Sequence, residues 1–262
     1  MKHFIFGAAV FFLTSSVQLF GQGSVSEFRI IKNNAFDVGE KLTFDVNYGF
    51  VTAGEAVMEV SEKKTISGRE AYKINFSVNS VGTFDPIYKV RDRYVTYLDV
   101  EGLFPWRFEQ HIREGGYTRD FSAYFDQRRG FAKTSEGTYD IPPYVNDIVS
   151  AFYLARTFNF SDLNPGDKFN LENFYKDKVY PLDVVFLGRE TIKVEAGTFD
   201  CIIVEPLVQE GGLFKSEGNI IVWLSDDDLR IPVKVKSKIV IGAIDAELTA
   251  YEGLIGELTS KK

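Results

Sequence analysis

The sequence predicts an all-β protein: a large antiparallel β-sandwich or open barrel, built from two similar halves with one short helix between them. Apolar and polar residues alternate with a period of two along most of the chain, as in strands with one packed and one wet face. Aromatic residues are abundant (24 Phe and 13 Tyr against 2 Met), which suits pleated, half-buried surfaces. A strand–turn–strand pattern also occurs twice, which indicates the two halves.

The repeated pattern covers 90–112 and 219–241. In each copy a strand, a tight turn and a second strand follow one another, and Pro105 corresponds to Pro232 with one residue inserted in the second turn. Similar turns also arise independently in β-rich chains, so coincidence is the alternative to a true repeat.

The openings of the two halves, 38–42 and 165–169, are also alike, and 68–72 loosely resembles 188–192. We therefore expect one β-domain over 24–262, with similar halves at about 36–140 and 164–251.

A helix is expected at about 147–158, between the halves. Pro142-Pro143 ends the strand pattern, and Asn146 or Asp147 can cap a helix. Ile148, Ala151, Phe152 and Ala155 fall on one face, whereas Ser150 and Arg156 lie away from it. We expect this amphipathic helix to cover an open end of the sheet.

Residues 1–23 have a basic start, an apolar run and small residues at the end, which is the pattern of a secretory signal peptide. The alternative, an uncleaved anchor, is weakened by polar interruptions in the run. No cysteine follows this leader, so lipoprotein processing there is excluded. We expect an exported, periplasmic protein without a transmembrane segment after cleavage.

Composition argues against several classes of function. The net charge of −7 without a basic cluster makes nucleic acid an unsuitable partner. His111 is the one histidine after the leader and Cys201 the one cysteine, so we predict no catalytic residues, metal site or cofactor. We expect Cys201 to be buried and the acidic run 226–228 to form a turn rather than a cation site.

Two groups of residues are candidate ligand contacts. Arg91 and Arg93 share one face of a strand and could hold an anionic headgroup, although paired surface charges of little consequence are commoner. Trp106, Phe108 and Trp223 lie on ring-rich strand faces that could line a ligand cavity, the alternative being a filled core.

Several segments resemble a known family. The sequences FDVGEKLTFDVNYGFVTAGEAVMEV, YKVRDRYVTYLD followed by LFPWRF, NDIVSAFYLART and the stretch from AGTFDC to IGAIDAEL are similar to the bacterial envelope family DUF3108, from about 36 to 248. This resemblance implies an exported bacterial protein and supplies no catalytic residue. The repeated hairpin also resembles, more weakly, that of periplasmic lipoprotein carriers with an open half-barrel.

These observations favour a non-enzymatic periplasmic protein that binds or shields an apolar or amphiphilic envelope component, such as a lipid or lipoprotein. One alternative is a structural or assembly partner that contacts an envelope protein through exposed sheet edges. Another is a carboxylate-based hydrolase, which requires two acidic side chains facing each other in a cleft.

Overall fold

The structure, a computed structural model, describes residues 28–208, 220–238 and 243–262, so the predicted leader over 1–23 lies outside the described residues. Within these ranges the chain forms fourteen strands and one helix. In chain order they are β1 (Lys41–Tyr48), β2 (Val51–Ile66), β3 (Arg69–Ser80), β4 (Arg91–Asp99), β5 (Pro105–Glu114), β6 (Tyr117–Asp126), β7 (Phe131–Thr134), β8 (Thr138–Asp140), α1 (Ile148–Ala155), β9 (Lys168–Tyr175), β10 (Lys178–Val194), β11 (Gly197–Val208), β12 (Ile220–Ser225), β13 (Pro232–Lys238) and β14 (Ala243–Glu252).

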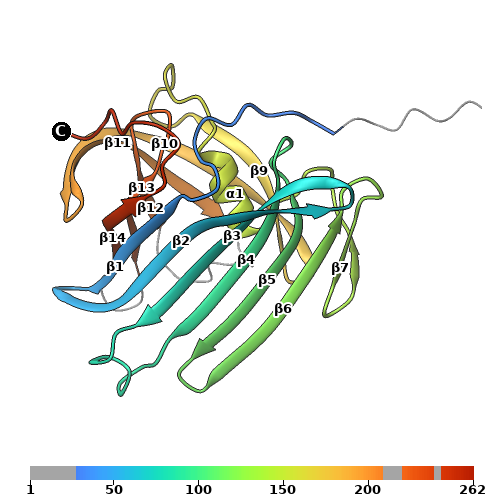
Figure 1. The fold of residues 1–262 in the computed structure, drawn as a ribbon, viewed down its shortest axis with the longest axis horizontal. Helices are drawn as coiled ribbons and strands as arrows, with labels where there is room; N and C mark the ends of the chain where they lie inside the picture. Colours follow the sequence, from blue (N-terminus) through green and yellow to red (C-terminus); the bar gives the residue numbers. More distant parts are fainter. Residues whose placement is uncertain (1–27, 209–219, 239–242) are drawn as a thin grey trace, which may run out of the picture.

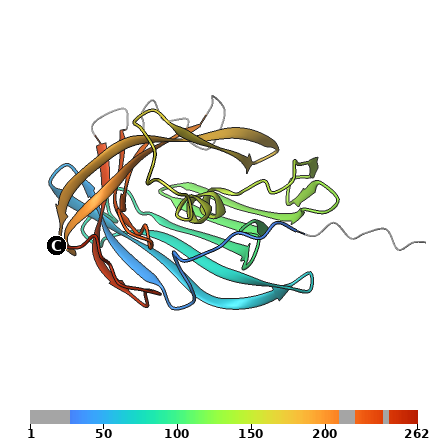
Figure 2. The ribbon, with the colours of Figure 1, turned by 90° about the horizontal axis from the view of Figure 1, so that it is seen from above.

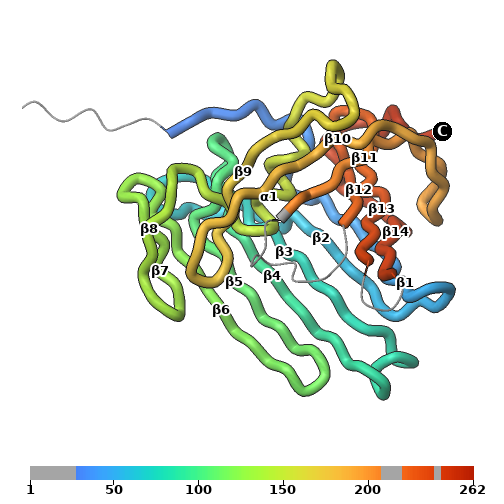
Figure 3. The backbone as a smooth tube through the Cα atoms, turned by 180° about the vertical axis from the view of Figure 1, so that it is seen from behind, coloured from blue at the N-terminus to red at the C-terminus, as the bar shows by residue number. Residues whose placement is uncertain are grey.

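All fourteen strands form one antiparallel sheet, in the order β8-β7-β6-β5-β4-β3-β2-β1-β14-β13-β12-β11-β10-β9. Each half is a meander of neighbouring hairpins, and the pairing of β1 with β14 joins the two halves. Figures 1 and 3 show the sheet from opposite sides, and Figure 2 shows it curling around α1. The predicted all-β class with one helix is confirmed, in its open-barrel form.

The terminal strands β8 and β9 do not pair with each other. Instead, Asn146 in the backbone before α1 pairs with part of the outer edge of β9: it donates its N–H to Glu172 O at 2.9 Å, and Phe174 donates to Asn146 O at 2.7 Å. At the other end, β8 contains only three residues. At both ends of the sheet, part of the edge is therefore blocked from pairing with a further strand.

The openings of the two halves have the same geometry. Gly39 before β1 and Gly166 before β9 both have φ 101°, a conformation that favours glycine. Their N–H groups donate to the carbonyls of Val60 in β2 (2.9 Å) and Phe186 in β10 (2.8 Å). In each case the second strand has a bulge immediately after that residue. The structure therefore supports a true repeat of β1–β6 by β9–β14.

The two copies of the hairpin, β4–β5 and β12–β13, also match in detail. Each proline, Pro105 and Pro232, pairs with a leucine across a bulge in the preceding strand. Two residues before each proline, the backbone has a positive φ: 48° at Leu103 and 41° at Arg230. Non-glycine residues adopt this conformation rarely, so its occurrence at both positions argues against coincidence.

The match between 68–72 and 188–192 is wrong. Gly68 lies in the turn before β3, whereas Gly188 lies at the bulge inside β10. The corresponding turn of the second half is formed by Glu195 and Ala196, just before Gly197 at the start of β11. A glycine serves both a turn and a bulge because each requires unusual backbone angles, so the local sequence alone does not distinguish them.

Candidate functional site

The helix α1 is attached at its N-terminal end to the first half of the sheet. Asp147 caps the helix: its Oδ1 accepts from the N–H groups of Val149 (2.8 Å) and Ser150 (2.9 Å), and its Oδ2 accepts from Thr96 Oγ1 in β4 at 2.6 Å. Ser150 Oγ in turn accepts from the N–H of Asp147, which completes a capping box. Burial raises the pKa of Asp147 to about 6, although these hydrogen bonds oppose the rise.

The C-terminal end of α1 is held by a buried ion pair that the sequence analysis missed. Arg156 donates from both terminal nitrogens to the Glu40 carboxylate, at 2.7 Å each, and both side chains are fully buried. Its Nη2 also donates to Ala35 O and Leu229 O, both at 3.0 Å. Arg156 therefore connects the helix to the segment before β1 and to the β12–β13 turn.

The prediction that Ser150 and Arg156 lie away from the packed face of the helix is wrong. Both are fully buried. The observed helix also ends at Ala155 rather than near 158. It sits inside the curve of the sheet with strands on several sides (Figure 2), so even polar positions on it meet protein rather than water.

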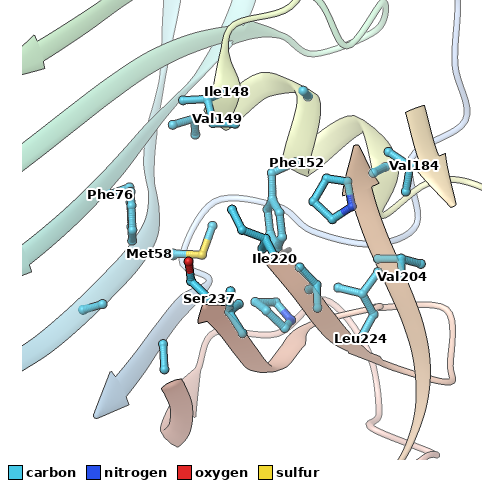
Figure 4. A pocket seen from close by; sticks show the side chains of 18 of the residues that line it. Met58, Phe76, Ile148, Val149, Phe152, Val184, Val204, Ile220, Leu224 and Ser237 are labelled. Carbon is cyan, nitrogen blue, oxygen red and sulfur yellow. The ribbon is translucent and has the colours of Figure 1, made fainter. Parts of the chain in front are cut away.

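Below α1 lies a cavity of about 390 Å³ between the helix and the concave face of the sheet, the face turned toward α1. Figure 4 shows side chains from both halves and from α1 converging on it. It is lined by Phe44, Ala56, Met58, Phe76, Tyr94, Ile148, Val149, Ala151, Phe152, Ala155, Leu182, Val184, Val204, Pro206, Ile220, Val222, Leu224, Pro232, Val235, Ser237 and Ala246.

The cavity extends from α1 to one edge of the sheet. We call this edge the lower rim: it carries the β1–β2, β3–β4, β5–β6 and β9–β10 turns and lies on the lower side of Figure 1. The lining residues Pro206, Ile220 and Ser237 lie within two residues of strand ends at this rim. Arg156 and the β4–β5 and β12–β13 turns lie at the opposite edge, the upper end.

Among the described lining residues none is charged, and two carry a hydroxyl, Tyr94 and Ser237. Both lie toward the lower rim, Ser237 one residue from the end of β13. Burial, followed by the nearby Asp92 carboxylate, raises the pKa of Tyr94 to about 12, so this hydroxyl stays neutral at physiological pH. The cavity is therefore apolar beside the helix and weakly polar near the rim.

The two arginines predicted as headgroup contacts lie on the opposite, convex face. Tyr94 faces the cavity, so alternation along β4 turns Arg91 and Arg93 outward. Arg91 forms an ion pair with Asp85 at 2.6 Å, whereas Arg93 is exposed. Neither residue lines the cavity, and their contact with a headgroup stays a prediction.

The three predicted aromatic contacts also lie outside the lining. Trp106 is buried in a small cluster at the upper end and donates from Nε1 to Asp99 at 3.0 Å. Trp223 is half-buried and donates to Glu190. Phe108 is buried in the core, and its ring centroid lies 6.4 Å from that of Tyr94, which does line the cavity. Their role in binding stays a prediction as well.

The residues that form the cavity are mostly small. Strands β10 to β14 contribute Val184, Val204, Val222, Val235 and Ala246. Their alternation was visible in the sequence, but nothing in it distinguished strands that border a cavity from strands that border a filled core. The available signal was side-chain volume: the corresponding faces of β5 and β6 carry phenylalanines instead.

Other predicted features lie as expected. Cys201 is buried, and this burial raises the pKa of its thiol to about 12. The acidic run 226–228 forms a turn in which Asp227 Oδ1 accepts from the N–H groups of Leu229 and Arg230.

One acidic pair, Asp92 and Glu114, meets part of what the hydrolase alternative requires, because the two side chains contact each other. Burial, followed by a hydrogen bond with Asp92, raises the pKa of Glu114. By the alternation of their strands, Asp92 and Glu114 lie on the same face of the sheet as Tyr94, which lines the cavity. Neither Asp92 nor Glu114 lines the cavity itself. The hydrolase alternative stays a prediction.

A comparison with protein families gives one match. Residues 43–249 match the model of a family described as "Protein of unknown function (DUF3108)". No curated protein matches the sequence.

Among solved structures, a β-barrel-like protein of the DUF1849 family from Brucella abortus has a TM-score of 0.53 at 11% identity, covering 82% of this chain and 97% of its own. This likeness shows the fold alone.

Two other structures are less similar. A protein from Bacteroides fragilis, described as exported and as having a YmcC-like fold, has a TM-score of 0.40 at 14% identity, covering 86% of this chain and all of its own. A hypothetical protein from Chlamydia trachomatis has a TM-score of 0.36 at 8% identity, covering 86% and 92%. Separately, α1 is too short to cross a bilayer, and no other helix occurs among the described residues.

Proposed function

Because the chain belongs to the DUF3108 family, whose function is unknown, we propose a function from the cavity itself: the protein binds one apolar or amphiphilic molecule between α1 and the sheet. The observation that carries this proposal is the uncharged, almost wholly apolar lining of a cavity of about 390 Å³. Ligand pockets in proteins are commonly of about this size, and a dry apolar cavity accepts apolar guests.

The lining also supports an orientation for the ligand. An acyl chain lies best beside α1, where Val149, Phe152 and Leu224 surround it. A polar end group lies best near the lower rim, where the Ser237 hydroxyl is half-buried and makes no hydrogen bond within the described part of the chain. Each buried CH₂ group contributes about 0.8 kcal/mol, so chain length should dominate affinity.

We propose further that the protein acts outside the cytoplasm, after removal of residues 1–23. The basic start and apolar run of this leader support export. Cell fractionation tests this part: the full chain should appear in the periplasmic fraction without its leader, and retention in the cytoplasm would contradict it.

The envelope-partner alternative requires exposed sheet edges. The three-residue β8 and the bridge from Asn146 to β9 block part of these edges, whereas the cavity lies between both halves, which makes the cavity the better-supported site. Crosslinking from β8 that trapped a single envelope protein, with no lipid bound, would favour the alternative.

The binding proposal is tested with cis-parinaric acid, a fatty acid that fluoresces in apolar surroundings. Ala56→Phe places a ring in the cavity, whereas Val57→Phe adds the same ring on the opposite face of β2. We expect Ala56→Phe to weaken binding about tenfold or more, the equivalent of two lost CH₂ contacts, and Val57→Phe to leave it unchanged. Equal binding by both variants, or no binding by the parent protein, would sink the proposal.

A further inference from the structure

The lower rim carries exposed apolar side chains on several separate turns. Phe50, at the tip of the β1–β2 turn, is fully exposed. In the β3–β4 loop, Ile87 is 75% and Tyr88 51% exposed, and Tyr117 is exposed at the β5–β6 turn. Leu207 and Ile244 add exposed apolar surface near the rim ends of β11 and β14.

These residues converge on one edge because of the topology. In an antiparallel meander alternate turns lie on the same side of the sheet, so the β1–β2, β3–β4 and β5–β6 turns project in one direction (Figure 1). The cavity reaches this same edge at Pro206 and Ser237.

Exposed cations accompany the apolar tips. Lys89, Arg93, Lys178 and Lys238 lie at or near rim ends of strands, and all four are exposed. No described residue forms an ion pair with any of them. Two exposed carboxylates, at Glu55 and Asp177, lie close to them in the described part of the chain, so cations predominate at the described tips although the chain as a whole carries −7.

We propose that the lower rim docks onto the surface of an anionic lipid bilayer, which would bring the rim end of the cavity close to the lipid. Tyrosines that flank apolar tips are favoured at the boundary between headgroups and acyl chains. Each lysine or arginine near an anionic bilayer adds attraction. This inference rests on the proposed function, because it assigns the route by which an apolar ligand reaches the cavity.

A second copy of the chain is the less suitable occupant. A stable protein interface needs a contiguous apolar core with matching shape, whereas these side chains stand on separate hairpins with polar residues between them, such as Asp85 and Thr118. A fluid bilayer accommodates separate tips at different depths, and the exposed cations complement anionic headgroups rather than an identical cationic surface.

The test compares two double variants of the full chain in flotation with vesicles of phosphatidylethanolamine and phosphatidylglycerol. Phe50→Ser/Tyr88→Ser removes apolar side chains from the rim. Ile30→Ser/Ile255→Ser removes exposed apolar side chains near the upper end and is the matched control. All four residues are exposed, so both variants should keep the melting temperature of the parent protein.

We expect the vesicle affinity of the rim variant to fall about tenfold or more, because the two aromatic rings that would insert into the lipid are removed. The control variant should bind like the parent protein. Binding to phosphatidylcholine vesicles should be weaker for all three. Equal binding by both variants, absence of vesicle binding by the parent protein, or rim-dependent dimers in light scattering without vesicle binding would overturn the inference.

Cis-parinaric acid separates this inference from the proposed function. The rim variant should bind the probe in free solution as the parent protein does, because neither Phe50 nor Tyr88 lines the cavity. Loss of probe binding by Ala56→Phe together with equal vesicle binding by the rim and control variants would leave the cavity proposal standing and end the docking proposal. Unchanged probe binding by Ala56→Phe, together with loss of vesicle binding by the rim variant alone, would end the cavity proposal and leave the rim as a lipid-binding surface.

Discussion

The two halves of the sheet repeat the same six-strand course and both line the cavity, yet strands β5 and β6 border a filled core where their equivalents, β13 and β14, border the cavity. On β5 and β6 the concave face carries Phe108, Phe121 and Phe125, which belong to the same buried cluster as Val149 and Tyr153 of α1. On β13 and β14 the equivalent face carries Val235 and Ala246, which leave space and line the cavity. Side-chain volume, with the backbone course unchanged, therefore decides whether the concave face is closed or can hold a guest.

The helix connects the two halves, and the largest predicted effect comes from breaking that connection. Arg156→Met leaves the Glu40 carboxylate buried without a partner, which costs about 3–5 kcal/mol of unfolding free energy. Urea denaturation measures this loss. Arg189→Met, which removes the partly exposed pair with Asp226, is the control and should cost about 1 kcal/mol or less. The double variant Arg156→Met/Glu40→Leu should recover most of the loss, and no recovery would contradict this account.

The N-terminal attachment of the helix should make stability depend on pH. The folded-state pKa of Asp147, about 6, is above its ordinary value of 3.8, so the folded protein keeps this proton longer than the unfolded chain. Its contribution is therefore fully present below about pH 4 and is lost as the pH rises through 6, by up to about 3 kcal/mol.

Asp147→Asn keeps a capping side chain but removes the titration. Urea unfolding of the parent protein and the variant from pH 4 to pH 8 should show the parent losing stability relative to Asp147→Asn across pH 4–6. A constant difference between the two proteins would show that Asp147 does not titrate in this range.

The equivalent hairpins should respond unequally to loss of their acidic groups. Asp99 is fully buried and accepts a hydrogen bond from Arg69 Nε at 2.6 Å. Burial alone would raise its pKa, but hydrogen bonds from Arg69, Gly102 and Trp106 outweigh burial and lower the pKa. Asp227 is half-buried and accepts mainly from neutral groups. We expect Asp99→Asn to cost about 2–3 kcal/mol and Asp227→Asn about 1 kcal/mol.

The pH dependence sharpens that contrast. Because the folded pKa of Asp99 is lowered, its stabilisation is lost as the pH falls through that pKa. The difference between parent protein and Asp99→Asn in urea unfolding should therefore shrink in acid. Equal losses of unfolding free energy for Asp99→Asn and Asp227→Asn at neutral pH would contradict this account. They would mean that the shared hairpin geometry, rather than the hydrogen-bond partners of each aspartate, determines the loss.

The smallest expected effect is the change in stability when a buried side chain is enlarged, and its sign should differ between the two halves. Val222→Leu adds volume beside the cavity and should stabilise the protein by about 0.5–1 kcal/mol. Ala123→Val adds volume to the filled face and should destabilise it by about 1 kcal/mol. Melting temperatures of both variants measure the two signs, and the same sign for both would remove the distinction between the halves.

The strands, the helix and the repeated hairpin could be predicted because they depend on local signals: period-two alternation, a capping aspartate and turn residues. The choice between sandwich and open barrel could not, because it depends on the pairing of β1 with β14, which no local pattern records. The buried Arg156 was missed because the amphipathic pattern assumes one wet face. The cavity was missed because alternation reports which face is packed and not how completely.

The pairing of β1 with β14 also has a consequence for folding. Thr249 donates to the Thr43 carbonyl across 206 positions of sequence, at 3.1 Å. Contacts of such long range slow folding, because chain entropy is lost before they form. Until β14 has been translated, the edge of β1 that pairs with it has no partner and can pair with other chains. Chaperone protection during synthesis would matter most at that edge.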